Sequence, residues 1–236
     1  MKIRPLPDID LARIASLPKE KQRAQLEQVR AGRPPITYQQ LAKRYHDIFN
    51  VQPEMFPDTK ATDWQEIENF LKKNCKSDLE IKVCVSVANA LYSFVRQNQI
   101  AARKHEFFPL ALGSGQKATF WQSFYYGING QVFVPLIDPR SSKGLTNEGR
   151  RFAFSMMNER IRGSDPDFAQ AVLAIIQFTR YDDGSRRARV TTDEGIELMS
   201  VDELEDKITY TYNLWYEVLQ DKVQEVAPAK AIGSLF

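Results

Sequence analysis

Residues 119–137 read TFWQSFYYGINGQVFVPLI, and this segment predicts a β-hairpin. Two runs rich in aromatic and β-branched residues, Thr119–Gly127 and Gln131–Ile137, flank the tripeptide Ile128-Asn129-Gly130. Asn-Gly between two such runs is a strong signal for a tight turn between antiparallel strands. The second half of the chain is therefore expected to contain an antiparallel sheet.

The residues around this hairpin predict further strands and helices. The run Val172–Phe178 is continuously apolar, which is typical of a strand buried on both faces. The turn Asp182-Asp183-Gly184 separates it from the next strand. The other elements expected in this half are a short strand at 107–112, a helix from about 146 to 162, a strand at 186–192 and a helix from about 201 to 220.

The first half of the chain predicts helices. Thr37 is expected to cap a helix that runs to about Asn50, and Asp63 is expected to cap the next one. A longer helix is expected from about Ser77 to Gln97, with an apolar stripe that includes Leu79. Residues 51–62 contain two prolines and no helical period, so this segment is expected to be an exposed loop.

Together these patterns predict an α+β fold, in which a helical N-terminal part packs on a mostly antiparallel sheet with covering helices. Three regions are expected along the chain. Residues 1–100 form a helical region that carries the exposed loop at 51–62, residues 101–225 form an α+β sheet region, and residues 226–236 form a flexible C-terminal tail.

The composition does not indicate a particular ligand. The chain has 236 residues, of which 32 are basic and 30 acidic, giving a formal net charge of +2. No apolar run reaches the ~20 residues that span a bilayer, so a cytoplasmic protein without a membrane partner is expected. Cys75 and Cys84 lack the spacing of zinc ligands and are expected to be reduced thiols in or near the core.

A metal-dependent nuclease is the enzymatic alternative. The predicted order of elements from about Ser77 to Phe178 is that of the restriction-endonuclease-like fold, whose sites place an Asp and a Glu-x-Lys on adjacent strands. Here the strand at 119–127 has no acid, and the next one ends in Asp138 without a Glu-x-Lys. Asp138 is expected to open an Asp-Pro turn and to pair with Arg140. No catalytic residue, metal or cofactor is therefore expected, and a degenerate nuclease stays the alternative.

A DNA-binding regulator is the second alternative. Residues 140–189 are rich in arginine, which is compatible with a solvated face held by ion pairs or with a patch that contacts phosphates. Residues 36–42 could begin a helix-turn-helix, but the next helix starts only after a loop of about a dozen residues, whereas that motif needs a turn of three or four. Direct contact with DNA is therefore left open.

The most informative peptide is Gln52-Pro53-Glu54-Met55-Phe56, which fits the pattern Gln-x-x-[Leu/Met]-Phe. That pattern resembles the linear peptide with which bacterial polymerases and repair proteins dock on the replication sliding clamp. Met55 and Phe56 can fill an apolar pocket, and Gln52 offers a donor and acceptors to a small polar one. The alternative is that Met55 and Phe56 hold the loop against the core.

These five residues, in a chain of this size and helical beginning, resemble the SocB-type bacterial replication-inhibiting toxins. The resemblance implies the toxin of a toxin–antitoxin pair, which occupies the peptide site of the DNA sliding clamp and competes with polymerase. It also implies an antitoxin of SocA type that acts as a proteolytic adaptor and delivers the toxin to a ClpXP-type protease.

The C-terminal residues echo the end of the same docking pattern. Ser234, Leu235 and Phe236 match its last positions, but Ile232 stands where the Gln should be. A second docking motif, a protease-recognition tail and an end without a role are all compatible with this sequence.

Overall fold

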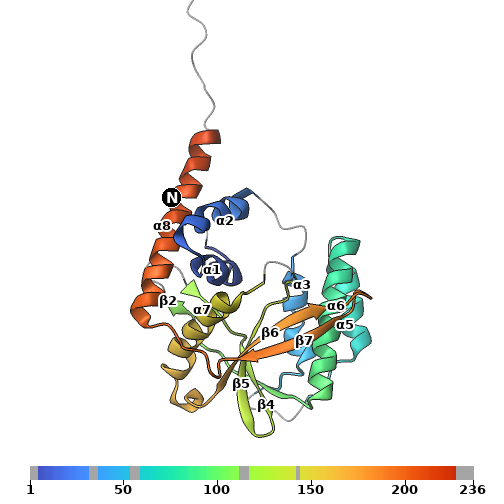
Figure 1. The fold of residues 1–236 in the computed structure, drawn as a ribbon. Coiled ribbons are helices and arrows are strands. Elements are labelled where there is room, and N and C mark those ends of the chain that lie inside the picture. The colour runs from blue at the N-terminus through green and yellow to red at the C-terminus, as the bar shows by residue number, and fades with distance from the viewer. Residues whose placement is uncertain (1–4, 32–36, 54–58, 112–116, 142–143, 227–236) are drawn as a thin grey trace, which may run out of the picture.

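The computed structural model describes residues 5–31, 37–53, 59–111, 117–141 and 144–226 (Figure 1). Its helices are α1 (Asp8–Ala15), α2 (Lys19–Ala31), α3 (Gln39–Ala42), α4 (Tyr45–Ile48), α5 (Trp64–Asn74), α6 (Asp78–Gln97), α7 (Asn147–Met157) and α8 (Val201–Val226), with a π-helix η1 (Asn158–Arg162) and a 3-10 helix η2 (Pro166–Phe168). Its strands are β1 (Ala101–Lys104), β2 (Leu110–Ala111), β3 (Lys117–Ala118), β4 (Phe124–Ile128), β5 (Gln131–Ile137), β6 (Val172–Arg180) and β7 (Arg186–Thr192).

A five-stranded sheet with the order β1-β4-β5-β6-β7 forms the centre of the molecule (Figure 1). Three of its four strand pairs are antiparallel, and only β5 and β6 run parallel. The connection between these two strands passes through α7, because parallel neighbours need a long crossover. The predicted α+β fold with a mostly antiparallel sheet is thereby confirmed.

The predicted hairpin joins β4 to β5. Its turn residues Asn129 and Gly130 have φ angles of 51° and 79°, and Ile128 pairs with Gln131 across the turn. Positive φ at both positions is the geometry that selects Asn-Gly. The first strand begins only at Phe124, because Phe120 and Trp121 before it are buried in the core instead of lying in the sheet.

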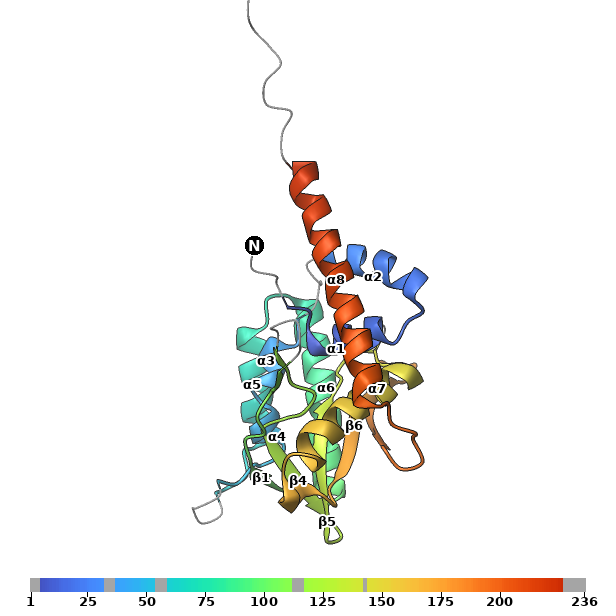
Figure 2. The same cartoon turned by 90° about the vertical axis from the view of Figure 1, so that its left-hand side faces the viewer.

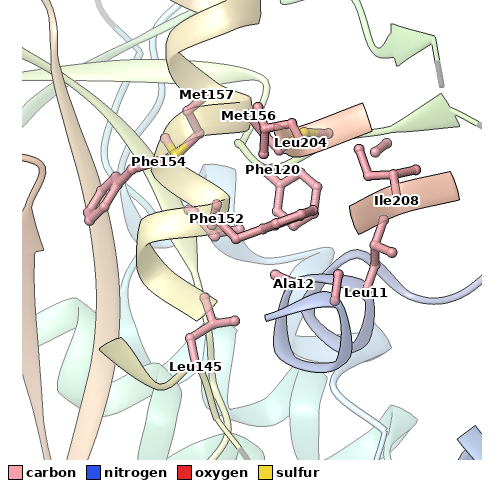
Figure 3. Packing of buried hydrophobic residues seen from close by; sticks show 14 of the residues in the cluster. Leu11, Ala12, Phe120, Leu145, Phe152, Phe154, Met156, Met157, Leu204 and Ile208 are labelled. Atoms are coloured by element: carbon pink, nitrogen blue, oxygen red, sulfur yellow. The ribbon is translucent and has the colours of Figure 1, made fainter. Parts of the chain in front are cut away.

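The sheet has a hydrophobic core on each face, as the alternation along β6 shows. Leu173 and Ile175 pack with residues of α1, α2, α7 and α8, whereas Ile176 packs with residues of α3 to α6. Figure 3 shows the first core, in which Phe152 of α7 points toward Phe120 and α1, whereas Phe154 points to the opposite side of α7. The prediction that β6 is buried on both faces is confirmed, and each core draws on segments from both halves of the chain.

The segment after Thr37 differs from the predicted single helix and forms the two short helices α3 and α4. Thr37 does not cap a helix. Its backbone N–H and its hydroxyl both donate to Oε1 of Glu80, at 3.2 and 2.6 Å. This contact ties the start of α3 to the first turn of α6, a partner 43 residues away that local sequence could not indicate.

Helix α6 begins as predicted, with the Ser77 hydroxyl accepting from the Glu80 backbone N–H at 3.2 Å. Its buried stripe is rotated from the predicted one. Leu79 is 54% exposed, and the buried face runs through Glu80, Cys84 and Val87. Cys84 is buried and Cys75 partly buried, and both are free thiols, as expected.

Two more boundaries differ from the predicted ones. Of the strand expected at 107–112, residues 107–109 lie outside any strand and Leu110–Ala111 form β2, and the unpredicted strand β1 precedes them. Helix α8 continues past Gln220 to Val226, and its C-terminal end extends beyond the rest of the fold (Figure 2). Within the part of the chain that the structure describes, no helix has the length and apolar character needed to cross a membrane.

Candidate functional site

The candidate docking segment starts at the outer edge of the sheet. The backbone N–H of Gln52 donates to the carbonyl of Ala102 at 2.9 Å, and its carbonyl accepts from the Lys104 N–H at 2.9 Å. These bonds form an isolated parallel bridge between Gln52 and Arg103. Because β1 is the terminal strand of the sheet, the chain leaves Gln52 at the rim of the molecule.

The Gln52 side chain ties the two ends of this loop together. Its Oε1 accepts from the backbone N–H of Thr59 at 2.5 Å and from the Thr59 hydroxyl at 3.0 Å. Its Nε2 donates to the carbonyls of Asn50 and Thr59 at 3.0 and 3.3 Å. The chain is therefore joined at Gln52 and Thr59, on either side of the undescribed residues, and we call this contact the loop clasp.

This geometry corrects the expectation that Gln52 is an exposed loop residue. The residue is only 8% exposed. The side-chain amide has both donors and acceptors. It can therefore bond backbone groups before and after the loop that would otherwise lack partners. Pro53 follows it and is half-buried.

The other residues of the two candidate motifs lie outside the described part of the chain. They are Glu54, Met55 and Phe56 of the loop and Ile232, Ser234, Leu235 and Phe236 of the C-terminus.

A rigid base supports the loop. Asn50 has a φ of 48°, which turns the chain out of α4, and the Val51 N–H donates to the His46 carbonyl at 2.9 Å. Phe49 is fully buried and contacts Phe124 of β4, with ring centroids 4.9 Å apart. The start of the loop is therefore held by the core, so its position relative to the sheet is defined.

A pocket of about 300 Å³ lies beside this base. Its walls come from the end of α4, the end of α6 and the chain that returns from the loop, and it combines apolar side chains such as Ile48 and Val95 with polar ones such as Arg96. Asn50 belongs both to this wall and to the Gln52 contacts.

Sequence reasoning missed two parts of this site. Thr59 closes the loop clasp, but a lone Thr in a loop carries no signal of its partner. Strand β1 was missed because Ala101-Ala102-Arg103-Lys104 contains no β-branched or aromatic residue.

Asp138, the residue of the nuclease alternative, makes hydrogen bonds that hold the fold together. Asp138 is fully buried, and its Oδ2 accepts from the Leu145 N–H at 2.8 Å and from Gln177 Nε2 at 3.1 Å. Burial raises the pKa of this carboxyl despite these bonds. The predicted pairing of the Asp138 and Arg140 side chains is wrong. The Arg140 guanidinium binds Asp10 at 2.6 and 3.1 Å, and only the Arg140 backbone N–H reaches Asp138.

Among the described residues, no group of three acidic, His or Cys side chains could hold a metal.

Several side chains of the arginine-rich segment form ion pairs. Arg162 binds Asp193 at 2.6 Å, and Arg151 lies 3.7 Å from both Glu148 and Glu203. Arg140 pairs with Asp10 as well, so three arginines of this segment form ion pairs, in agreement with the interpretation of a solvated face.

Comparisons with known proteins give the family. Residues 9–225 match the family described as "Sliding clamp-binding bacterial toxin SocB". The chain is 33% identical over 235 residues to the DNA replication inhibitor toxin SocB of Caulobacter vibrioides (strain NA1000 / CB15N), covering 99% of this chain and 98% of that protein. No solved structure matches significantly. The resemblance of residues 52–56 to a clamp-docking peptide thus occurs within a match over nearly the whole length, and the chain belongs to the SocB family of sliding clamp-binding bacterial toxins.

Proposed function

We propose that this toxin inhibits DNA replication by inserting the loop that contains residues 52–56 into the peptide site of the sliding clamp, where it competes with polymerase. Membership of a clamp-binding toxin family supports the partner. The observation that supports the choice of segment is the loop clasp, which fixes Gln52 and Thr59, the described residues that flank it, beside the edge strand β1. Met55 and Phe56 are the proposed apolar anchors, with Pro53 and Glu54 between them and Gln52.

The clasp favours binding for an energetic reason. A flexible peptide loses conformational entropy when a groove orders it, whereas a loop whose ends are already joined loses less. The hydrogen bonds between Gln52 and Thr59 hold these ends together before binding. A closed loop should therefore bind the clamp more tightly than the same residues in a free peptide.

Gln52 is proposed to have two roles, closing the loop and contacting the clamp, and it cannot perform both at the same time. In the closed loop, its amide is engaged with Asn50 and Thr59. Entering a polar pocket on the clamp would require these bonds to break, at a cost of ~1–3 kcal/mol per buried group left unpaired. We therefore propose that Gln52 first shapes the loop and contacts the clamp only when the loop opens.

Replacing Gln52 by alanine in two contexts should separate these uses. In the full chain, Gln52→Ala is expected to weaken clamp binding about tenfold, since it removes the clasp. In a peptide of residues 50–58, which has no fixed clasp, the same replacement should have little effect if Gln52 acts by shaping the loop. Titration calorimetry against purified clamp measures both. An equal loss in chain and peptide would instead assign Gln52 to direct contact with the clamp.

The proposed function itself is tested by competition. Full-length protein should bind purified clamp with roughly micromolar affinity or better, and a clamp-docking peptide from a polymerase should displace it. Clamp from which the protein cannot be displaced, or clamp that does not bind it, would refute docking at the peptide site.

We further propose that an adaptor antitoxin of SocA type delivers the toxin to a ClpXP-type protease, and that residues 232–236 help in its recognition. Deleting these five residues should lengthen the cellular lifetime at unchanged melting temperature, because apolar residues at a chain end are accessible to an unfoldase. A chase after translation arrest measures the half-life. The variant Leu235→Ser with Phe236→Ser keeps the length of the tail and should act like the deletion. Equal half-lives for all three proteins would exclude a role of the tail.

A further inference from the structure

A polar pocket of about 250 Å³ lies at the opposite end of the sheet from the loop-bearing edge strand, where the start of α7 meets β6 and β7. Arg150 of α7, Gln177 and Thr179 of β6 and Arg189 of β7 contribute to its lining. The parallel strands β5 and β6 both end here. The carboxyl ends of parallel strands joined by a helical crossover are a recurrent place for ligands.

Gln177 organises the pocket, and its orientation follows from its partners. Its Nε2 donates to the Asp138 carboxylate at 3.1 Å and to the Leu145 carbonyl at 3.1 Å, and both of these groups can only accept. The amide oxygen therefore faces the other way, where it accepts from Arg150 at 2.9 Å. Asp138 thus lies on the far side of Gln177 from Arg150, and its oxygens are already bonded within the fold.

Three arginines line this pocket, and Arg140 among them is paired with Asp10. Arg150 and Arg189 have no acidic partner among the residues that the structure describes. Arg150 donates only to neutral oxygens, those of Leu145, Asn147 and Gln177. Arg189 stands opposite Gln177 in the strand register, and its side chain makes no hydrogen bond or ion pair within the described chain. Burial lowers the pKa of Arg150, and the positive charge of Arg189 lowers it further.

We propose that this pocket binds a phosphate group between Arg150 and Arg189. Two guanidinium groups on different elements, with the hydroxyls of Ser141 and Thr179 beside them, offer donors from several directions. A planar carboxylate matches a single guanidinium fork, whereas a tetrahedral phosphate uses several donors at once and carries more charge. Its arrival would also remove the repulsion between the two arginines.

The test uses the full-length protein and two variants of β7. Arg189→Gln removes the group without an internal partner. Arg187→Gln is the matched control, because Arg187 lies two residues away on the same face of the strand, is also exposed and lies outside the pocket. Inorganic phosphate should raise the melting temperature relative to chloride at equal ionic strength. Arg189→Gln should weaken the apparent affinity for phosphate about tenfold and Arg187→Gln should not.

A second arm distinguishes the source of the phosphate. If the pocket takes the DNA backbone, Arg189→Gln should also weaken binding of a short duplex, and the Arg187 variant should retain it. If it takes a small phosphate compound, only the response to inorganic phosphate should change. Equal behaviour of the two variants toward both probes, or no binding of either probe by the unchanged protein, would overturn the proposal. Clamp binding serves as the check that both variants are folded.

Discussion

Replacing Met55 and Phe56 together by alanine is expected to abolish clamp binding and growth inhibition at the same time. A short loop is expected to bind a groove with a roughly micromolar Kd, which is a binding free energy of about −8 kcal/mol. A few anchor side chains supply most of this free energy. Each truncation should cost ~2 kcal/mol or more, so the double variant should bind roughly 700-fold more weakly or worse. Surface plasmon resonance with immobilised clamp and a growth assay under induced expression measure the two effects.

A second apolar pair provides the control for this experiment. Leu79 and Phe108 are 54% and 73% exposed, and both lie outside the loop. Their double replacement by alanine removes a similar kind of surface and should leave clamp affinity and toxicity unchanged. The competing interpretation holds that Met55 and Phe56 pin the loop to the core. It predicts a sharp fall in melting temperature for their double variant, with Gln52→Ala neutral in toxicity, and that pattern would refute docking through this loop.

Asp138→Ala is expected to lower the free energy of unfolding by about 3 kcal/mol without lowering the clamp affinity of the folded protein. The replacement leaves the Leu145 N–H and the Gln177 amide without their buried acceptor, and each such loss costs ~1–3 kcal/mol. Relief of the burial that raises the pKa of Asp138 offsets part of this. Urea denaturation at neutral pH measures the stability, and clamp titration well below the transition measures the affinity.

Two comparisons make this experiment decisive. Asp183→Ala should leave stability unchanged, because that carboxylate is exposed and bonds only within its own turn. Asp138→Asn should be intermediate, since an amide keeps one acceptor and turns the other into a donor. Loss of growth inhibition by Asp138→Ala, with a folded protein and intact clamp affinity, would support the nuclease alternative, and cleavage of a plasmid with divalent metal would then be the direct assay.

Local sequence was sufficient wherever the deciding interactions connect neighbours in the chain. The Asn129-Gly130 turn, the cap at Ser77 and the apolar run of β6 each follow from the conformational preferences or the burial pattern of adjacent residues. The pentapeptide at 52–56 was also identified from adjacent residues, and its role in clamp docking stays a prediction. The α+β fold class could be predicted on this basis.

Tertiary structure alone decided which polar groups meet. Gln52 is buried because Thr59 and the edge strand β1 offer it partners, and Arg140 binds Asp10 instead of the nearby Asp138 because α1 packs against α7. Arg150 and Arg189 line one pocket because Arg150 of α7 contacts Gln177 and the register of β6 and β7 places Arg189 opposite that residue. The free energy of such a contact depends on burial and on distance in space, and neither is encoded by the spacing of the residues along the chain.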